Sequence, residues 1–217
     1  MRVFLAIVRR DLLVEGRARE LVPSMVMLGV LLVTVASAAG LDRAAAAPVL
    51  WLSVVFAASF GLARSFHHDL EHDQWSGLAM APVDRAVVYL GKAAANFIII
   101  LAAELVIVGV FAVFFNVRGG VVWTALAVTM VAGTAGIVAI GTLLGAMIAL
   151  ARLREALLPL LLLPVAVPAV LAAVRATEIV LAGRSLAHAQ GELQLLAAFT
   201  ALCVAIPVVL FEYVLEE

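Results

Sequence analysis

Long apolar runs separated by short polar stretches dominate the chain. A helix that crosses a membrane needs roughly 20 mostly apolar residues. The runs that approach or exceed this length lie at about 22–40, 44–63, 93–115, 121–150, 156–174 and 194–214. We therefore predict an all-α membrane protein with six transmembrane helices that form one transmembrane domain over residues 1–217.

The composition supports a location in lipid, because 66% of the 217 residues are apolar and only 13% are charged. A soluble domain of this size could not bury so much apolar surface. The net charge of −1 gives no reason to expect nucleic acid as a partner. A single cysteine, Cys203, excludes a disulfide within the chain. The apolar part of the N-terminal segment is short for a signal peptide, so we expect this segment to be retained.

The first twenty residues combine apolar and basic positions at helical spacing. Phe4, Ile7, Val8 and Leu12 recur along one side, and arginines occupy the other. This pattern predicts an amphipathic interfacial helix over residues 1–20 that lies on the cytoplasmic leaflet. A polar stub that only sets the orientation is the alternative.

Basic residues are distributed unevenly between the two ends of the predicted spans. If the N-terminus and the connections after even-numbered spans face the cytoplasm, ten of the fourteen Lys and Arg residues lie there. Cytoplasmic connections normally carry this excess. We therefore expect a multi-pass protein with both termini in the cytoplasm.

The longest polar connection follows the second span and covers residues 64–85. Phe66, Leu70, Trp75 and Leu78 form a rough apolar stripe in it, and acidic residues lie among them. An amphipathic helix with an acidic face suits docking into a groove of another protein. A helix resting on the bilayer surface with its tryptophan among the headgroups is the alternative.

Histidines in this connection raise the question of a metal site. His68 and His72 are four residues apart and would share one face of a helix, as His67 and Glu71 would. Such a pair can ligate a metal, but no third ligand is specified, and solvated side chains explain the pattern equally. His188, in a later connection, could be an axial haem ligand or a plain exposed side chain. We predict no metal ligands.

Polar residues inside the spans are the remaining candidates. Glu104 lies in the middle of the third span, where a charged carboxylate is costly. It must face the bundle interior, a water path or a partner, or be protonated and bonded to a neighbouring helix. Asn96, two turns earlier on the same face, is its candidate companion. Gly141 and Gly145 in the fourth span have the spacing that permits close helix packing.

Three prolines interrupt the fifth span and mark candidate helix breaks: Pro159, Pro164 and Pro168. Each removes a backbone hydrogen bond and bends or breaks a helix. Broken spans line cavities or moving parts in many membrane proteins, and a plain kink is the alternative.

The polar connection contains a pattern of Arg64, Phe66, Asp69, Leu70, Gly77, Leu78, Pro82 and Lys92. The start RRDLLVEGRARE, the pair Gly133–Thr134 and the LPVAVP of residues 163–168 accompany it. Together these features resemble the cytochrome c maturation permeases of the haem exporter protein B family, which are type-2 ABC exporter membrane subunits.

The resemblance implies a permease without catalysis of its own. The sequence agrees with this, because it has no GxxxxGK[ST] motif for binding nucleotide. A coupling helix between spans two and three would dock into a cytoplasmic ATPase that binds ATP. The coupling interface would comprise Phe66, Asp69, Leu70, Glu71, Trp75, Leu78 and Pro82.

The same resemblance implies two ATPase copies, a second copy of the permease, haem-handling membrane subunits and a periplasmic haem chaperone in a bacterial inner membrane. Haem would be the cargo, or a haem-loaded chaperone would be released, and no cofactor is assigned to the chain itself. A generic type-2 exporter of a lipid, drug or polysaccharide is the alternative. A membrane enzyme using Glu104 and a metal transporter using His68 and His72 are further alternatives.

Overall fold

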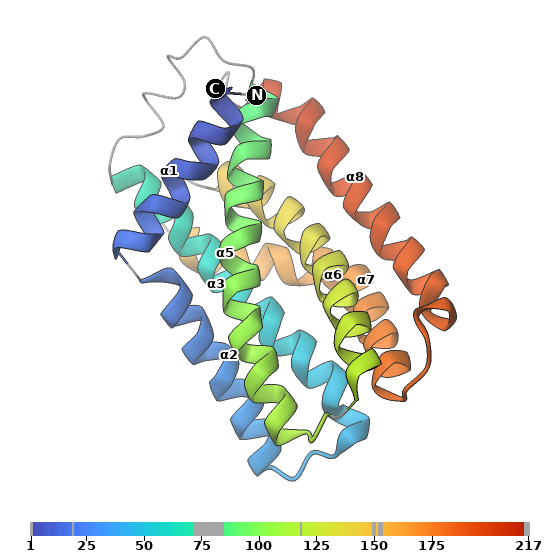
Figure 1. The fold of residues 1–217 in the computed structure, drawn as a ribbon. Helices are drawn as coiled ribbons and strands as arrows, with labels where there is room; N and C mark the ends of the chain where they lie inside the picture. The colour runs from blue at the N-terminus through green and yellow to red at the C-terminus, as the bar shows by residue number, and fades with distance from the viewer. Residues whose placement is uncertain are drawn as a thin grey trace.

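The computed structural model describes residues 2–18, 20–71, 85–117, 119–148, 151 and 154–214, and these residues form an all-helical bundle (Figure 1). The long helices are α1 (Arg2–Ala18), α2 (Leu21–Ala38), α3 (Ala46–Glu71), α5 (Arg85–Phe114), α6 (Gly120–Met147), α7 (Arg154–Leu181) and α8 (Gln190–Val214). Two short 3₁₀ helices, η1 (Arg43–Ala45) and η2 (Leu186–Ala189), precede α3 and α8.

Six helices, α2, α3, α5, α6, α7 and α8, are long and apolar enough to cross a membrane. The predicted six-span, all-α fold class is therefore confirmed. The spans of α3 and α6 are 78% and 72% buried, whereas those of α2 and α8 are 17% buried. The core of the bundle thus lies around α3 and α6, and α2 and α8 are peripheral.

Several helix ends differ from the expected span boundaries, and α7, for example, continues to Leu181 rather than ending near residue 174. Helix α3 continues to Glu71 rather than ending near residue 63, and α5 begins at Arg85 rather than near residue 93. Hydropathy marks only the apolar part of a helix, while backbone hydrogen bonds continue until a residue stops them. The first part of the expected coupling connection is therefore a continuation of α3, and residues 72–84 lie outside the described residues.

Glycines of α6 let α3 approach closely. A Cβ atom on any of three glycines would clash with a large α3 side chain. These pairs are Gly133 with Trp51, Gly141 with Leu62 and Gly145 with Phe66. The packing role predicted for Gly141 and Gly145 is confirmed. The indole nitrogen of Trp51 also donates a 2.8 Å hydrogen bond to the Thr177 hydroxyl, which ties α3 to α7.

Helix α7 is continuous through Pro159, Pro164 and Pro168, so these candidate positions do not interrupt the helix in this conformation. A proline removes a single i to i−4 hydrogen bond. In lipid, no water replaces the bonds that a break would expose, so the remaining bonds favour one unbroken helix. Pro164 and Pro168 lie on the exposed side of α7.

The N-terminal helix α1 packs alongside α5 (Figure 1). Ile7 is buried, and its side chain lies against Gly91, where an added Cβ would be 3.1 Å away. The predicted helix at the N-terminus is present, and one of its sides belongs to the bundle.

Candidate functional site

The candidate site is the place where α1, the end of α3 and the start of α5 meet, which we call the α1–α3–α5 junction. Helix α3 ends here at Glu71, and α5 begins here at Arg85. Any force on the connection between these residues therefore reaches the bundle through the two helix ends. The junction is built from an ion pair, an aromatic contact and a chain of hydrogen bonds.

The ion pair joins α1 to α5. The Lys92 ammonium lies 3.1 Å from Asp11 Oδ2, and the two side chains are only 12% and 8% exposed. Arg10 donates two hydrogen bonds, of 2.8 and 3.0 Å, to the other oxygen of Asp11. Removing one member of a buried ion pair leaves an uncompensated charge, which costs about 3–5 kcal/mol. This pair therefore fixes α1 on α5.

The aromatic contact involves Phe66 near the end of α3. Its ring is 2% exposed and fills the space opposite Gly145 of α6. The Lys92 ammonium lies 5.6 Å from the ring centroid, which is within cation–π range. The Phe66 ring thus lies inside the helix bundle and not on its outer surface. Gly145 of α6 makes this possible, because a larger side chain at that position would exclude the ring.

A buried hydrogen-bonded chain crosses three helices beside Phe66. The hydroxyl of Ser65 donates to Asn96 Oδ1 at 3.1 Å, and Asn96 Nδ2 donates to the Thr142 hydroxyl at 3.3 Å. The chain links α3, α5 and α6. The structure therefore pairs Asn96 with these hydroxyls and not with Glu104, which lies eight residues, or about 12 Å, further along α5.

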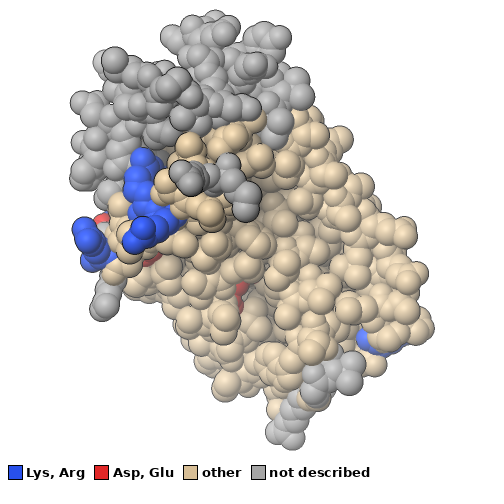
Figure 2. All heavy atoms as spheres, turned by 45° about the horizontal axis from the view of Figure 1, so that its top comes forward, with Lys and Arg blue, Asp and Glu red and all other residues tan. Residues whose placement is uncertain are grey.

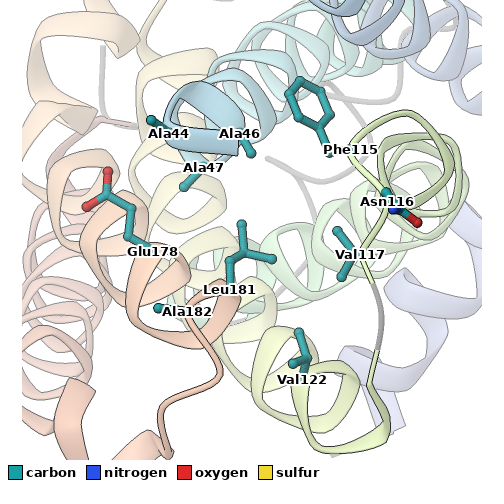
Figure 3. A pocket seen from close by; sticks show the side chains of 10 residues that line it. All are labelled: Ala44, Ala46, Ala47, Phe115, Asn116, Val117, Val122, Glu178, Leu181 and Ala182. Carbon is teal, nitrogen blue, oxygen red and sulfur yellow. The ribbon is translucent and has the colours of Figure 1, made fainter. Parts of the chain in front are cut away.

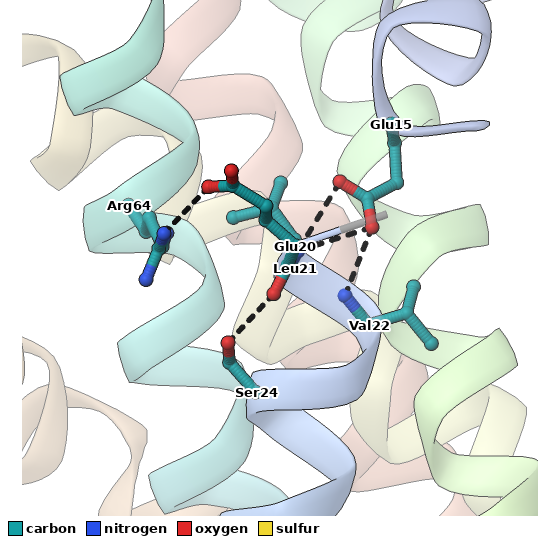
Figure 4. A network of polar contacts seen from close by, with 6 residues as sticks. All are labelled: Glu15, Glu20, Leu21, Val22, Ser24 and Arg64. Carbon is teal, nitrogen blue, oxygen red and sulfur yellow. Dashed lines mark hydrogen bonds and ion pairs between the residues drawn. The ribbon is translucent and has the colours of Figure 1, made fainter. Parts of the chain in front are cut away.

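Polar contacts also hold the start of α2 at this end of the bundle (Figure 4). One carboxylate oxygen of Glu15 accepts hydrogen bonds from the backbone N–H groups of Leu21 and Val22 at 3.1 and 3.0 Å. These are free donors at a helix N-terminus, so Glu15 of α1 caps α2. Arg64 of α3 pairs with Glu20 at 2.6 Å.

The predicted coupling residues are divided by the structure. The residues Asp69, Leu70 and Glu71 belong to the last turns of α3. The residues Trp75, Leu78 and Pro82 lie outside the described residues.

Glu104 is a buried acidic residue within the span formed by α5, and it is 3% exposed. The hydroxyl of Thr134 on α6 donates a hydrogen bond to Glu104 Oε1. Glu104 Oε2 is buried and has no hydrogen-bond partner among the described residues. Glu104 is one of the residues that line an apolar groove of about 410 Å³ between α5 and α6.

A second cavity of about 560 Å³ lies at the opposite end of the bundle from the junction (Figure 3). The start of α3, the end of α5, the start of α6 and the end of α7 surround it. Its size is in the range of small-molecule sites. Its lining residues are Ala44, Ala46, Ala47, Phe115, Asn116, Val117, Val122, Glu178, Leu181 and Ala182.

Within the described part of the chain, His, Cys, Asp and Glu residues form no group of three or more that could hold a metal ion. His188 is exposed in η2, and its Nδ1 lies 3.1 Å from the Ser185 hydroxyl. Residues other than Lys, Arg, Asp and Glu cover most of the described surface in Figure 2, where basic side chains lie toward the left of the view and at its lower right edge. Such a surface suits a bundle surrounded by lipid.

Comparison with protein families matches residues 2–214 to the family described as CcmB protein. No curated protein matches the chain.

Proposed function

This chain belongs to the CcmB protein family, the membrane permease subunits of the haem export system for cytochrome c maturation. We propose that it couples ATP hydrolysis by a separate ATPase either to haem export or to release of a haem-loaded periplasmic chaperone. The family match favours this function over a generic exporter of lipids, drugs or polysaccharides.

One observation carries the coupling proposal: α3 runs without interruption from Ala46 to Glu71. The proposed ATPase-docking residues Asp69 and Glu71 therefore belong to the same continuous helix that forms the most buried span. A displacement of the docked segment is a displacement of α3. No flexible joint within the described part of α3 would absorb it.

The junction explains how such a displacement spreads. Phe66 transmits a shift of α3 to α6 through Gly145 and to α5 through Lys92. Lys92 passes it to α1 through Asp11. The hydrogen bonds from Ser65 through Asn96 to Thr142 connect the same helices at a second level.

The exposed arginines Arg9 and Arg17 of α1 suit anionic lipid headgroups, which supports an interfacial position for α1. With the excess of Lys and Arg at this end, the proposal places both termini and the junction in the cytoplasm of a bacterial inner membrane. The assembly would contain two ATPase copies, two permease copies, haem-handling membrane subunits and a periplasmic haem chaperone. The nucleotide site would lie in the ATPase alone.

Deletion of the gene tests the function. We expect loss of covalent haem from c-type cytochromes, detected by haem stain on denaturing gels, and restoration by the wild-type chain in trans. Unchanged covalent haem in a cell without a second maturation system would contradict the function.

Charge reversal tests the docking surface. The double variant Asp69→Lys/Glu71→Lys should fail to co-purify with the ATPase and fail to restore covalent haem. Glu192→Lys, at the other end of the bundle, is the matched control and should restore both. Normal ATPase co-purification with the double variant would overturn the docking proposal.

A further inference from the structure

The hydroxyl group of Tyr89 lies where three helices meet, about one turn after the start of α5. Tyr89 is 1% exposed, and its side chain packs against Leu143 of α6. Its hydroxyl is 2.9 Å from the carbonyl oxygen of Ala139 in α6 and 3.3 Å from that of Cys203 in α8. A phenolic hydroxyl has one proton to donate, so the two carbonyl groups share it. The Tyr89 hydroxyl therefore connects α5 with both α6 and α8.

The Cys203 carbonyl group is a special acceptor because of the residue four positions later. In an α-helix, this carbonyl would accept a hydrogen bond from the backbone N–H of residue 207. Residue 207 is a proline, which has no backbone N–H. Helix α8 nevertheless continues past this position to Val214. The Tyr89 hydroxyl thus supplies a donor to a carbonyl group whose usual helical donor does not exist.

The Ala139 carbonyl group differs in this respect. Ala139 lies inside α6, and the residue four positions later, Leu143, has a backbone N–H. Loss of the Tyr89 hydroxyl would therefore leave Ala139 its helical bond. At Cys203 it would remove the donor that replaces the missing one, in a lipid environment where water does not take its place.

Tyr89 also lies in the part of α5 that would first receive a movement of the coupling connection. It follows Arg85, the first residue of α5, by four positions, and Lys92 of the junction comes three positions later. The contacts of the junction join α1, α3, α5 and α6. Helix α8 is peripheral, and its span is only 17% buried. The hydrogen bond from Tyr89 to Cys203 adds α8 to the helices that are tied to the start of α5.

We propose that Tyr89 is a positioning residue for transport, whose hydroxyl links the start of α5 to α8 at the carbonyl group that Pro207 leaves without a helical donor. A displacement of the ATPase-docked connection then reaches α8 through this bond. The missing helical bond at Pro207 also makes α8 easier to bend at this level. This inference rests on the proposed function, because the displacement comes from the ATPase. It deepens that function by assigning Tyr89 to coupling and α8 to the helices that move.

Removal of the hydroxyl is the first test. Tyr89→Phe keeps the ring and breaks both hydrogen bonds. We expect the variant chain to co-purify with the ATPase at the wild-type level and the purified complex to hydrolyse ATP, while covalent haem in c-type cytochromes falls several-fold. Wild-type covalent haem would overturn the proposal. A loss of covalent haem in proportion to a loss of assembled complex would also overturn it, because Tyr89 would then only stabilise the chain.

Thr129 provides the matched control. Its hydroxyl is also buried, but it donates to the carbonyl of Ala125 within the same helix, α6, at 3.0 Å. Thr129→Val deletes this hydroxyl and removes no bond between helices, so covalent haem should stay at the wild-type level. An equal loss of covalent haem in Thr129→Val and Tyr89→Phe would overturn the proposal, since removing any buried hydroxyl would then have the same effect.

Pro207→Ala separates the coupling role of Tyr89 from a purely stabilising one. The alanine brings a backbone N–H that can donate to the Cys203 carbonyl within α8. Tyr89→Phe should therefore lower the thermal unfolding midpoint of the purified chain less in the Pro207→Ala background than in the wild-type background. The double variant should still give several-fold less covalent haem than Pro207→Ala alone, which keeps the hydroxyl. An equal loss of midpoint in both backgrounds, or equal covalent haem in the double variant and Pro207→Ala, would overturn the proposal.

Failure of this inference and failure of the proposed function have different signatures. Gene deletion tests the function and does not depend on the Tyr89 hydroxyl. If deletion abolishes covalent haem and the Tyr89→Phe chain restores it fully, the inference fails and the function stands. If deletion leaves covalent haem unchanged, the function fails and the inference fails with it.

Discussion

Lys92 and Asp11 lie 3.1 Å apart across the interface of α5 and α1, and both are almost fully enclosed by the bundle. Lys92 also lies over the ring of Phe66, so α1, the end of α3 and the start of α5 share one polar centre. This arrangement makes the N-terminal helix a structural part of the permease and not only a surface anchor.

Breaking the Lys92–Asp11 pair should destabilise the chain. Among the described residues, Lys92→Met leaves the enclosed carboxylate of Asp11 with Arg10 as its remaining cationic partner, and we expect a loss of about 3 kcal/mol in the free energy of unfolding. Adding Asp11→Asn should recover part of this loss because no unbalanced carboxylate remains. Thermal unfolding of the purified proteins in detergent ranks the stabilities of the wild type and of the single and double variants. Strictly additive losses would show that the two residues do not interact.

A methyl group at Gly145 should displace Phe66. The added Cβ would come closer to two carbon atoms of the Phe66 ring than real Cβ contacts allow. We expect Gly145→Ala to cost about 1–3 kcal/mol of stability. Combining it with Phe66→Leu, a smaller side chain, should recover stability.

The control for this change is Gly16→Ala, because a Cβ at Gly16 meets nothing within 4 Å. In a helix this substitution should be neutral or stabilising by up to about 1 kcal/mol. If Gly145→Ala unfolds at the same temperature as the Gly16→Ala control, then Phe66 does not pack as described.

The Thr177 hydroxyl should stabilise the folded chain by accepting the hydrogen bond from the Trp51 indole N–H. Thr177→Val keeps the shape of the side chain but leaves the buried indole N–H without an acceptor, which costs about 1–3 kcal/mol. Thr177→Ser keeps the hydroxyl and should lose less. The comparison is between the thermal unfolding midpoints of the two purified variants. A midpoint for Thr177→Ser below that of Thr177→Val would contradict this explanation.

The number and order of the spans could be predicted because lipid requires each crossing segment to satisfy its backbone within one helix. Apolar runs of sufficient length therefore identify the spans directly. The packing of Gly145 was also predictable, because its spacing from Gly141 follows helix geometry. Which α3 side chain fills the space was not, since that depends on how two helices are aligned.

The α1–α3–α5 junction was the part that the sequence pattern missed. Asp11 counts as polar in a hydropathy pattern, so the pattern assigns it to the outer side of α1. One signal was present: Asp11 follows the buried Ile7 by four residues and so shares its helical face. Its partner Lys92 is distant in sequence, and only the tertiary structure brings the two charges together.

The prolines of α7 provide the last prediction, which concerns movement. Pro164 and Pro168 lie on the exposed side of α7, so replacing them with alanine removes little packing and restores two backbone hydrogen-bond donors. We expect Pro164→Ala/Pro168→Ala to be at least as stable as the wild type and to assemble with the ATPase normally. If α7 must bend at these positions during the transport cycle, the straighter helix should lower covalent c-type haem several-fold. Leu160→Ala, a neighbouring exposed position of α7, is the control and should leave covalent haem unchanged. Wild-type covalent haem in the double proline variant would mean that the prolines are tolerated in α7 without serving its movement.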